Sequence, residues 1–523
     1  MLDSALPKLK QQSRPSTPRT LLCAERIFKY TADRRPFYDD LSAIFATLAI
    51  SLPLESHHVG LILPSNSFAF SFTSNEAIDN LMHLKMQQNI QSTDAFGRKT
   101  SSITITSYQV DRLACMDLMQ SFLWARFIKC ANDLENVKFR NSLLLQMTPK
   151  GIAILDLFVQ RNGVMSPDVK KILKSSYNSM RLIVLERDPT TDYITASKQL
   201  VEIVFQRFAG CRPNYHNFVS AASSSTQNSS VTDDTVTYAD SSSGVKIADC
   251  KRVHLKEYRD CFSGLEAKRW ILDCTTAVSD KEALTLLDAF LTRQLIVGLD
   301  SRSLASKETF IIDKSAYYTL TDAGKRLAGW NASFNIASIS QAAVRSRSPI
   351  PRVSSPATDK KQKLHRILEN PALRLLFREH LEDNFCEENL SFYLESIKVI
   401  ALYEELKKNG STSARKIRVN LCITEAWCVY QVYLAQGSAS EVNIDHDLRV
   451  RVREGMNAIE ARKAKNSDRE KTSKTSLELS MANLKKIIDL LEEVRSQVFR
   501  LMALDSVPKF MKTRKFIDLG VDI

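Results

Sequence analysis

The sequence has 523 residues, which is too long for one hydrophobic core and predicts about three domains. Its composition, 44% hydrophobic and 25% charged, is typical of a globular protein, and no apolar run approaches the roughly 18 residues of a membrane-spanning helix. Residues 1–20 lack the charged-then-apolar pattern of a secretory signal, so we expect a cytoplasmic protein, and the net charge of +13 admits nucleic acid or an anionic membrane surface as a partner.

The ten cysteines are scattered along the chain and form no C-x-x-C pair. In a cytoplasmic chain this pattern predicts reduced thiols, without disulfides or a zinc site. The sequence also has no Gly-rich phosphate loop, no paired carboxylates in a plausible cleft and no nucleophile beside a base. We therefore expect no metal, no cofactor and no catalytic residues, and we do not expect an enzyme.

Residues 1–36 are predicted to be a disordered N-terminus, because their first half is rich in proline and almost free of aromatic residues. A folded region begins near Phe37. Its first helix is predicted at residues 38–48, with Leu41, Ile44, Phe45 and Leu48 on one face. Residues 59–72 alternate and are β-prone, which predicts a strand.

A pattern of residues in this region recurs later in the chain. The frame F-x-x-x-E-A-x-x-x-[LI] begins at Phe72 and again at Phe262. Two further pairs of segments match in the same order: residues 122–128 with 290–296, and residues 145–151 with 318–324. In the last pair a strand turns into a helix through a threonine cap. Three matches in one order indicate a duplicated module.

Each copy reads as two helices and then two short strands around a turn, which is the plan of a winged helix. The repeated frames resemble the DEP domain, a winged-helix fold, more closely in the second copy than in the first. The resemblance implies two α+β modules. We place the first DEP-like module at residues 37–218 and the second at residues 246–332. In the first module a polar insert near residues 91–107 separates the two halves.

The first module also receives a helical extension over residues 160–208, where Leu200, Ile203, Val204 and Phe208 lie in register and Gly210 ends the helix. Residues 219–245 are rich in Ser, Thr and Asp and are predicted to be a linker. A second linker, rich in Ser, Pro and Arg, is predicted at residues 333–358.

The winged helices admit two kinds of partner. One is DNA, which this fold reads with its second long helix. In the second copy that helix, at about residues 279–294, has a net charge of about −1, which argues against contact with phosphates. The DEP resemblance implies instead docking to the cytoplasmic tail of a seven-helix receptor or to anionic lipid, and hence peripheral association with the plasma membrane. The residues proposed for it are Lys251, Arg252, Lys256, Lys268 and Arg269. The alternative is that these charges only solvate a surface.

The C-terminal part, residues 359–523, is predicted to be an all-α helical bundle with three polar corners. Apolar residues at helical spacing lead from Leu364 to Phe377 and resume after residues 385–389, F-C-E-E-N. The second corner is residues 441–445, E-V-N-I-D, and the third is residues 501–506, L-M-A-L-D-S, at the end of a long helical run. We expect the corners to share one end of the bundle.

Four blocks in this order resemble the RGS box of regulators of G-protein signalling: an apolar start, F-x-E-E-N-L-x-F-Y, E-V-N-I-D and L-M-x-x-D-S-x-x-x-F-x-K-[ST]. Tandem DEP-like modules before an RGS box resemble the fungal developmental and pheromone-desensitising regulators. The resemblance implies that the bundle binds the switch regions of a GTP-bound Gα subunit in the transition-state geometry and accelerates GTP hydrolysis. It implies contacts from Phe385, Glu388, Asn389, Asn443, Asp445, Leu501, Asp505, Ser506 and Lys509.

Several residues depart from the family pattern. Phe385 stands where the family often has tyrosine, and Lys509 where arginine is commoner, which removes a bidentate fork. Pro508 predicts that the helix bends or restarts there. Phe392 and Tyr393 are assigned to the core. The polar residues 461–480 are predicted to be a loop, with the final helix starting near Met481.

Two other functions stay open at this point. One is a winged-helix protein that binds nucleic acid and uses its C-terminal bundle only for protein contacts. The other is a scaffold that binds Gα without accelerating hydrolysis, for which Asn389 and Asn443 are the discriminating residues.

Overall fold

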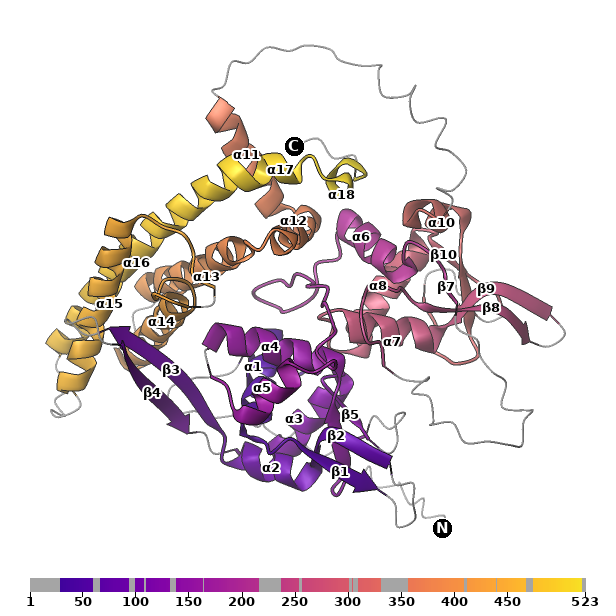
Figure 1. Ribbon diagram of the computed structural model, residues 1–523, viewed down its shortest axis with the longest axis horizontal. Coiled ribbons are helices and arrows are strands. Elements are labelled where there is room, and N and C mark those ends of the chain that lie inside the picture. Colours follow the sequence, from indigo (N-terminus) through magenta and orange to yellow (C-terminus); the bar gives the residue numbers. More distant parts are fainter. Residues whose placement is uncertain are drawn as a thin grey trace, which may run out of the picture.

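The computed structural model describes residues 29–59, 66–93, 99–107, 110–131, 138–162, 164–215, 237–253, 256–300, 303, 309–330, 356–408, 412–438, 440–466 and 474–519. Figure 1 shows a first winged-helix module in indigo and purple, a second in pink, and a helical bundle in orange and yellow. Among the helices of these residues, none combines the length and apolar character needed to cross a bilayer.

The first module is a four-stranded sheet covered by helices. Its elements are α1 (Tyr38–Ser51), β1 (Glu55–Val59), β2 (Asn66–Thr73), α2 (Ser74–Met82), α3 (Arg112–Trp124), β5 (Ile128–Cys130), β6 (Leu144–Met147), α4 (Pro149–Asn162) and α5 (Pro167–Leu173). The strand order is β1-β2-β6-β5. The polar insert between α2 and α3 forms an antiparallel hairpin, β3 (Lys85–Thr93) with β4 (Lys99–Ser107).

The second module has a five-stranded sheet in the order β10-β11-β9-β8-β7. Its elements are α6 (Lys198–Ala209), β7 (Asn214–Tyr215), β8 (Lys246–Val253), β9 (Lys256–Ser263), α7 (Gly264–Cys274), α8 (Asp280–Thr292), β10 (Ile296–Gly298), β11 (Tyr317–Leu320) and α10 (Asp322–Ala328). Helix α6 lies inside this module, where the ring of Phe208 packs on Phe262, Trp270 and Phe290 at centroid distances of 5.4, 5.4 and 5.3 Å.

Helix α6 is therefore the first helix of the second module, as α1 is of the first. The helical extension predicted at residues 160–208 is helical in the end of α4, in α5 and in α6, and residues 174–197 form an irregular connecting segment. Within the linker predicted at residues 219–245, residues 237–245 pack on the second module: Tyr238 is buried, and its backbone N–H donates to Asp273. Residues 216–236 lie outside the described residues.

The two modules share local geometry at matched positions. Thr148 and Thr321 each cap the helix after the second paired strand, accepting from the backbone N–H of Gly151 and Gly324 at 3.0 Å. A Cβ at Gly151 or Gly324 would lie 2.1 Å from the carbonyl oxygen of Phe127 or Leu295, the residue just before β5 or β10, so only glycine fits. The matched segments 145–151 and 318–324 thus contain a glycine at which the helix packs closely against the backbone in both modules.

The bundle contains α11 (Pro356–Glu369), α12 (Pro371–Asp383), α13 (Glu388–Lys408), α14 (Thr412–Tyr433), α15 (His446–Asn466), α16 (Lys474–Leu501), the π-helical turn η2 (Met502–Ser506), α17 (Val507–Phe510) and α18 (Arg514–Ile517). Helices α15 and α16 extend into the predicted loop at 461–480, of which residues 467–473 are not described. Pro508 was expected to bend or restart the helix; it lies in the first turn of α17, which begins at Val507 and continues directly from η2. Phe392 is fully buried and Tyr393 is partly buried against the core.

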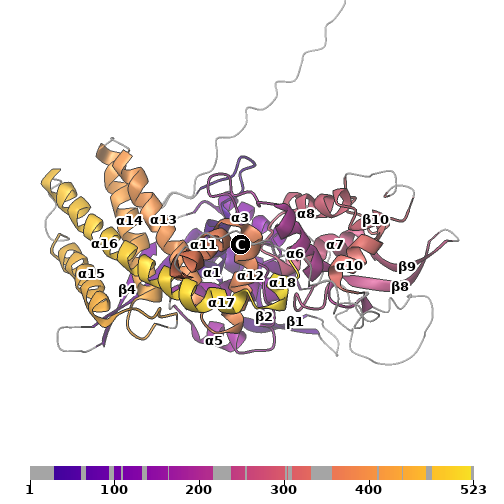
Figure 2. The same cartoon turned by 90° about the horizontal axis from the view of Figure 1, so that it is seen from above.

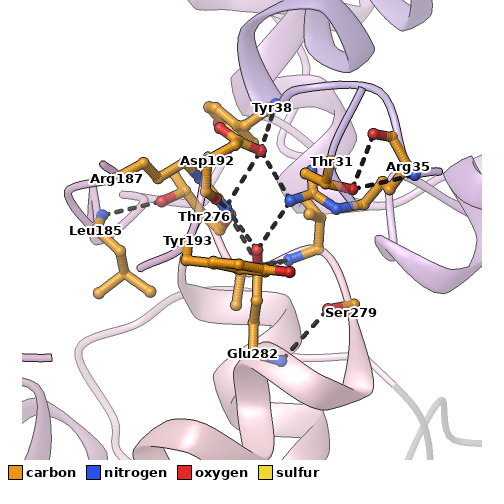
Figure 3. Close-up of polar contacts among 12 residues, drawn as sticks. Thr31, Arg35, Tyr38, Leu185, Arg187, Asp192, Tyr193, Thr276, Ser279 and Glu282 are labelled. Atoms are coloured by element: carbon orange, nitrogen blue, oxygen red, sulfur yellow. Dashed lines mark hydrogen bonds and ion pairs between the residues drawn. The ribbon is translucent and has the colours of Figure 1, made fainter. Parts of the chain in front are cut away.

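Residues 29–36, which the sequence placed in a disordered N-terminus, form a turn closed by Thr31 and Arg35. The turn carries Arg35 into a charged cluster that joins the two modules (Figure 3). There Arg35 and Arg187 donate to Glu282 at 3.1 and 2.5 Å, and Asp192 accepts from Arg35 at 2.7 Å. Although burial alone would raise it, the bonds from Arg187 hold the pKa of Glu282 below its ordinary value.

Two more buried contacts join the modules. Arg126 forms a bidentate ion pair with Asp273, with N–O distances of 2.7 and 3.1 Å. The Nζ of Lys150 donates to the carbonyls of Leu272 and Ala277 at 2.6 and 2.5 Å. Desolvation lowers the pKa of the fully buried Lys150 from 10.5 to about 7. The modules therefore meet through a buried polar interface, which fixes their relative orientation.

The helical bundle packs against both modules (Figure 2). Helix α14 contacts α4, and Arg161 on α4 pairs with Glu395 on α13 at 2.7 Å. Helix α12 contacts α6, and Arg374 on α12 forms a bidentate pair with Glu186 of the connecting segment. A continuous apolar core runs from the second module into the bundle.

Candidate functional site

The three polar corners lie at one end of the bundle, and together we call them the contact surface: residues 384–389, 441–445 and 501–509. The first and third corners are neighbours: burial raises the pKa of the Cys386 thiol, and the charges of Asp505 and Lys509 lie close enough to influence that pKa as well. The second corner is tied to the last helix, since the backbone N–H of Asp445 donates to the side chain of Gln497 at 3.4 Å.

The first corner turns the chain sharply between α12 and α13. Phe385 has a φ of 53°, a left-handed conformation that is uncommon outside glycine, and its side chain is 92% exposed. The turn is closed by backbone hydrogen bonds from Phe385 to Glu382 and from Cys386 to Leu381, at 3.1 and 3.0 Å. The ring of Phe385 is thus exposed to solvent, and packing of this side chain does not account for its left-handed backbone conformation.

Glu388 and Asn389 follow at the start of α13. The Nδ2 of Asn389 donates to the carbonyl of Cys386 and to Glu388, at 3.1 and 2.9 Å. Asn389 is only 6% exposed, and its buried Oδ1 has no hydrogen-bond partner within the described part of the chain. Burial raises the pKa of Glu388, with Glu387 adding to the effect. Asn389 therefore faces inward in this state, whereas the resemblance predicted a direct contact.

The second corner alternates buried and exposed residues. Val442 and Ile444 are buried, and the backbone N–H of Val442 donates to the carbonyl of Tyr433 at 2.9 Å. Because Val442 and Ile444 anchor the segment, Asn443 and Asp445 project into solvent. An ion pair between Glu441 and Arg449 fixes the start of the corner.

The third corner contains a π-helical turn, η2, a feature that is frequent at functional sites. Leu501 and Leu504 are 38% and 49% exposed, while Met502 and Ala503 are buried. Leu501 lies outside the core because Met502 follows Val498 by four residues and takes the core position. Sequence analysis did not identify Leu504, whose exposure depends on this turn.

The remaining residues of the third corner differ in exposure. Asp505 and Lys509 are exposed and form an ion pair with each other at 2.8 Å. Ser506 is buried. Of the nine residues proposed from the resemblance, the structure therefore exposes Phe385, Asn443, Asp445, Leu501, Asp505 and Lys509, half-buries Glu388, and buries Asn389 and Ser506.

The residues proposed for docking on membrane or receptor lie on the second module. Lys268 pairs with Asp280 at 3.2 Å and Arg269 with Glu266 at 2.6 Å, so neither is an isolated surface charge. Lys251, Arg252 and Lys256 lie on strands β8 and β9, but their side chains lie outside the described residues. Among the residues that the structure describes, no group of His, Cys, Asp and Glu side chains has a metal-binding arrangement.

Comparison with known families divides the chain in the same order as the structure. Residues 40–175 match the model of the fungal-differentiation regulator winged helix domain, and residues 244–320 that of the domain found in Dishevelled, Egl-10, and Pleckstrin (DEP). Residues 363–519 match the regulator of G protein signaling domain. The first module is thus a winged helix that matches a family model other than DEP.

Relatives extend over most of the chain. It is 34% identical over 504 residues to the developmental regulator flbA of Emericella nidulans, which covers 94% of this chain and 65% of that protein. It is 24% identical over 497 residues to the regulator of G-protein signaling 1 of Schizosaccharomyces pombe, covering 93% of this chain and 91% of that protein. The chain therefore spans less than two thirds of the Emericella nidulans protein.

Proposed function

The chain is an RGS protein of the fungal kind, and from this premise we propose that it switches off heterotrimeric G-protein signalling by accelerating GTP hydrolysis on a Gα subunit. The observation that carries the proposal is the contact surface. It joins exposed apolar residues to exposed amide and carboxylate groups, and the winged-helix modules contact the bundle through α12, α13 and α14 without covering these residues. Its mixture of an apolar centre and polar groups is typical of a protein interface.

The mechanism follows from what Gα already holds. Gα carries its own catalytic arginine and a glutamine that orients the attacking water, so no donated arginine finger is needed. A partner that binds the switch regions better in the transition-state geometry than in the ground state lowers the barrier by that difference in binding energy. The bundle acts as such a partner and supplies no catalytic group of its own.

Each exposed residue has a role that its chemistry suits. Phe385 and Leu501 bury apolar area against Gα, and Leu504 adds to them. The amide of Asn443 both donates and accepts, so it is able to fix a switch segment and its glutamine side chain. Asp505 accepts from a donor on Gα while Lys509 neutralises it on the other side. Glu388 and Asn389 lie beside these residues at the start of α13 and add a carboxylate and an amide oxygen to the contact.

We further propose that the first module is a diverged second copy of the DEP plan. The shared threonine caps, the shared glycine contacts and the matching order of helices and strands support this relationship. The modules place the protein at the cytoplasmic face of the plasma membrane by docking to a receptor tail or to anionic lipid.

The nucleic-acid alternative gains no support from the second long helix of the DEP module. The first turn of α8 is covered by the connecting segment: Glu282 is bound by Arg187, and Lys281 lies over the ring of Tyr193 at 4.9 Å. In the first module the corresponding helix α3 exposes Leu113 and Trp124, which are not groups that bind phosphate.

The test is single-turnover hydrolysis of GTP preloaded on candidate Gα subunits, with and without the full chain. We expect acceleration by the wild type and a loss of about tenfold or more in Asn443→Ala, since its side chain is exposed on the contact surface. Arg451→Ala is the matched control, because it removes an exposed ion pair with Glu493 elsewhere in the bundle. Unchanged acceleration in Asn443→Ala contradicts the assigned role, and no response from any Gα refutes the proposed function.

A further inference from the structure

Helix α12 leads directly into the first corner, and its C-terminal half is held by residues from outside the bundle. Arg207 on α6 donates to both carboxylate oxygens of Glu379, at 3.3 and 2.6 Å. Arg181 in the connecting segment donates to Glu382 and Asp383, both at 3.0 Å. Figures 1 and 2 both show α6 beside α12. The winged-helix modules therefore reach to within a few residues of the contact surface.

The charge of α12 explains why it needs these partners. Its last turns carry Glu379, Glu382 and Asp383, at the helix end where the macrodipole disfavours negative charge. Carboxylates three and four residues apart also repel one another. Within the described part of the bundle, Lys515 is the cation that pairs with them, at 2.8 Å from Glu379 and 3.9 Å from Asp383. Further positive charge comes from Arg181 and Arg207.

The first corner depends on the last turn of α12. Phe385 adopts its left-handed conformation with its side chain in solvent, so side-chain packing does not hold it. Its position is fixed by backbone hydrogen bonds from Phe385 and Cys386 to the carbonyls of Glu382 and Leu381. A strained residue persists only where its surroundings determine it. If the last turn of α12 frays, the corner loses its geometry.

From this chain of contacts we propose that Arg181 and Arg207 are positioning residues for Gα recognition. They neutralise the C-terminal turn of α12, and through it they hold Phe385 and the start of α13 in the conformation that binds. The winged-helix modules thereby serve the activity of the bundle directly, in addition to any role in docking. The activity part of this inference rests on the proposed function.

Positioning changes affinity more than the rate at saturation. For a partner that binds only the ordered corner, the apparent dissociation constant equals the intrinsic dissociation constant divided by the fraction of molecules in which the corner is ordered. Arg207 and Glu379 are 29% and 14% exposed, so we expect Arg207→Ala to raise the half-saturating concentration about fivefold. Arg181 is 55% exposed, and its loss is expected to cost about twofold. The maximal acceleration should stay the same in both variants.

The experiment uses the full chain and two readouts. The first is single-turnover hydrolysis over a range of concentrations for wild type, Arg207→Ala, Arg181→Ala and the double variant, with Arg451→Ala as the matched control. The second is hydrogen exchange followed by mass spectrometry over residues 379–390. We expect faster exchange there in the double variant and no change in α16. Arg207→Glu should impair both readouts more than Arg207→Ala, because it places another carboxylate against Glu379.

The two readouts separate the inference from the proposed function. If the wild type accelerates no Gα, the proposed function fails, while exchange at residues 379–390 still decides whether the arginines hold the corner. Unchanged exchange in the double variant overturns the positioning role. A fall in maximal acceleration at an unchanged half-saturating concentration also overturns it, because it indicates damage to the bound complex. A cooperative loss of protection throughout the bundle identifies general unfolding and likewise counts against it.

Discussion

Replacing Lys150 by methionine should change how stability depends on pH. Lys150 is fully buried between the winged-helix modules, and its pKa is lowered from 10.5 to about 7. A neutral amine has two N–H groups, which match the carbonyls of Leu272 and Ala277. Between the two pKa values the unfolded chain binds about one proton more than the folded chain, so the free energy of unfolding rises as pH increases.

The magnitude follows from the same linkage. One proton corresponds to about 1.4 kcal/mol per pH unit, so Lys150 adds about 2 kcal/mol to the free energy of unfolding between about pH 7.5 and about pH 9. Lys150→Met loses this dependence. It also leaves two buried carbonyls unpaired, at about 1–3 kcal/mol each. The margin between the free energies of unfolding of wild type and variant should therefore shift in favour of the wild type as pH increases.

Urea unfolding of the full chain at several pH values, followed by tryptophan fluorescence, measures this margin. Lys171→Met serves as the matched control, because Lys171 is an exposed lysine of the same module, paired with Asp168. Its curve should run parallel to that of the wild type. If the margin between wild type and Lys150→Met stays constant over this pH range, Lys150 does not titrate as a buried neutral amine and the reasoning is refuted.

Two further changes test other parts of the molecule. Arg126→Met leaves the carboxylate of Asp273 buried without its cation and should lower the free energy of unfolding by about 3–5 kcal/mol. The double variant, Arg126→Met with Asp273→Leu, should recover most of that loss. Thermal unfolding measures both variants, and equal losses in the two would contradict the pairing. Phe385→Ala should leave the thermal midpoint unchanged, because the ring is exposed, but weaken binding to Gα carrying GDP and aluminium fluoride by about tenfold in a titration; unchanged affinity would remove Phe385 from the interface.

The sequence predicted the repeated module because its matched strings cover residues with little freedom. Gly151 and Gly324 stand where a side chain would overlap a carbonyl, and the threonine caps supply a hydrogen bond that each helix start requires. These constraints persist when other residues diverge. The first helix of the second module was missed because a long segment separates α6 from the strands it covers, so its apolar face looked like an extension of the previous module.

The candidate site was predicted in outline and not in detail. The spacing of the three corners was sufficient to expect them at one end of a bundle. Local patterns do not predict the π-helical turn that follows Leu501 at the end of α16. Nor do they predict that Asn389 turns inward, since this depends on the carbonyl of Cys386 and the side chain of Glu388.

The polar interface between the modules was not predicted, because Arg126, Lys150 and Asp273 look like surface residues in the sequence. Apolar side chains of similar size would hold the modules together about as well, since the cost of desolvating an ion pair largely offsets its attraction. What the charged groups contribute is one relative orientation, because any other leaves a buried charge unpaired. The same holds for Arg207 and Glu379 between α6 and the bundle. If the DEP module docks on a membrane or receptor, these contacts make the contact surface face Gα in a fixed direction.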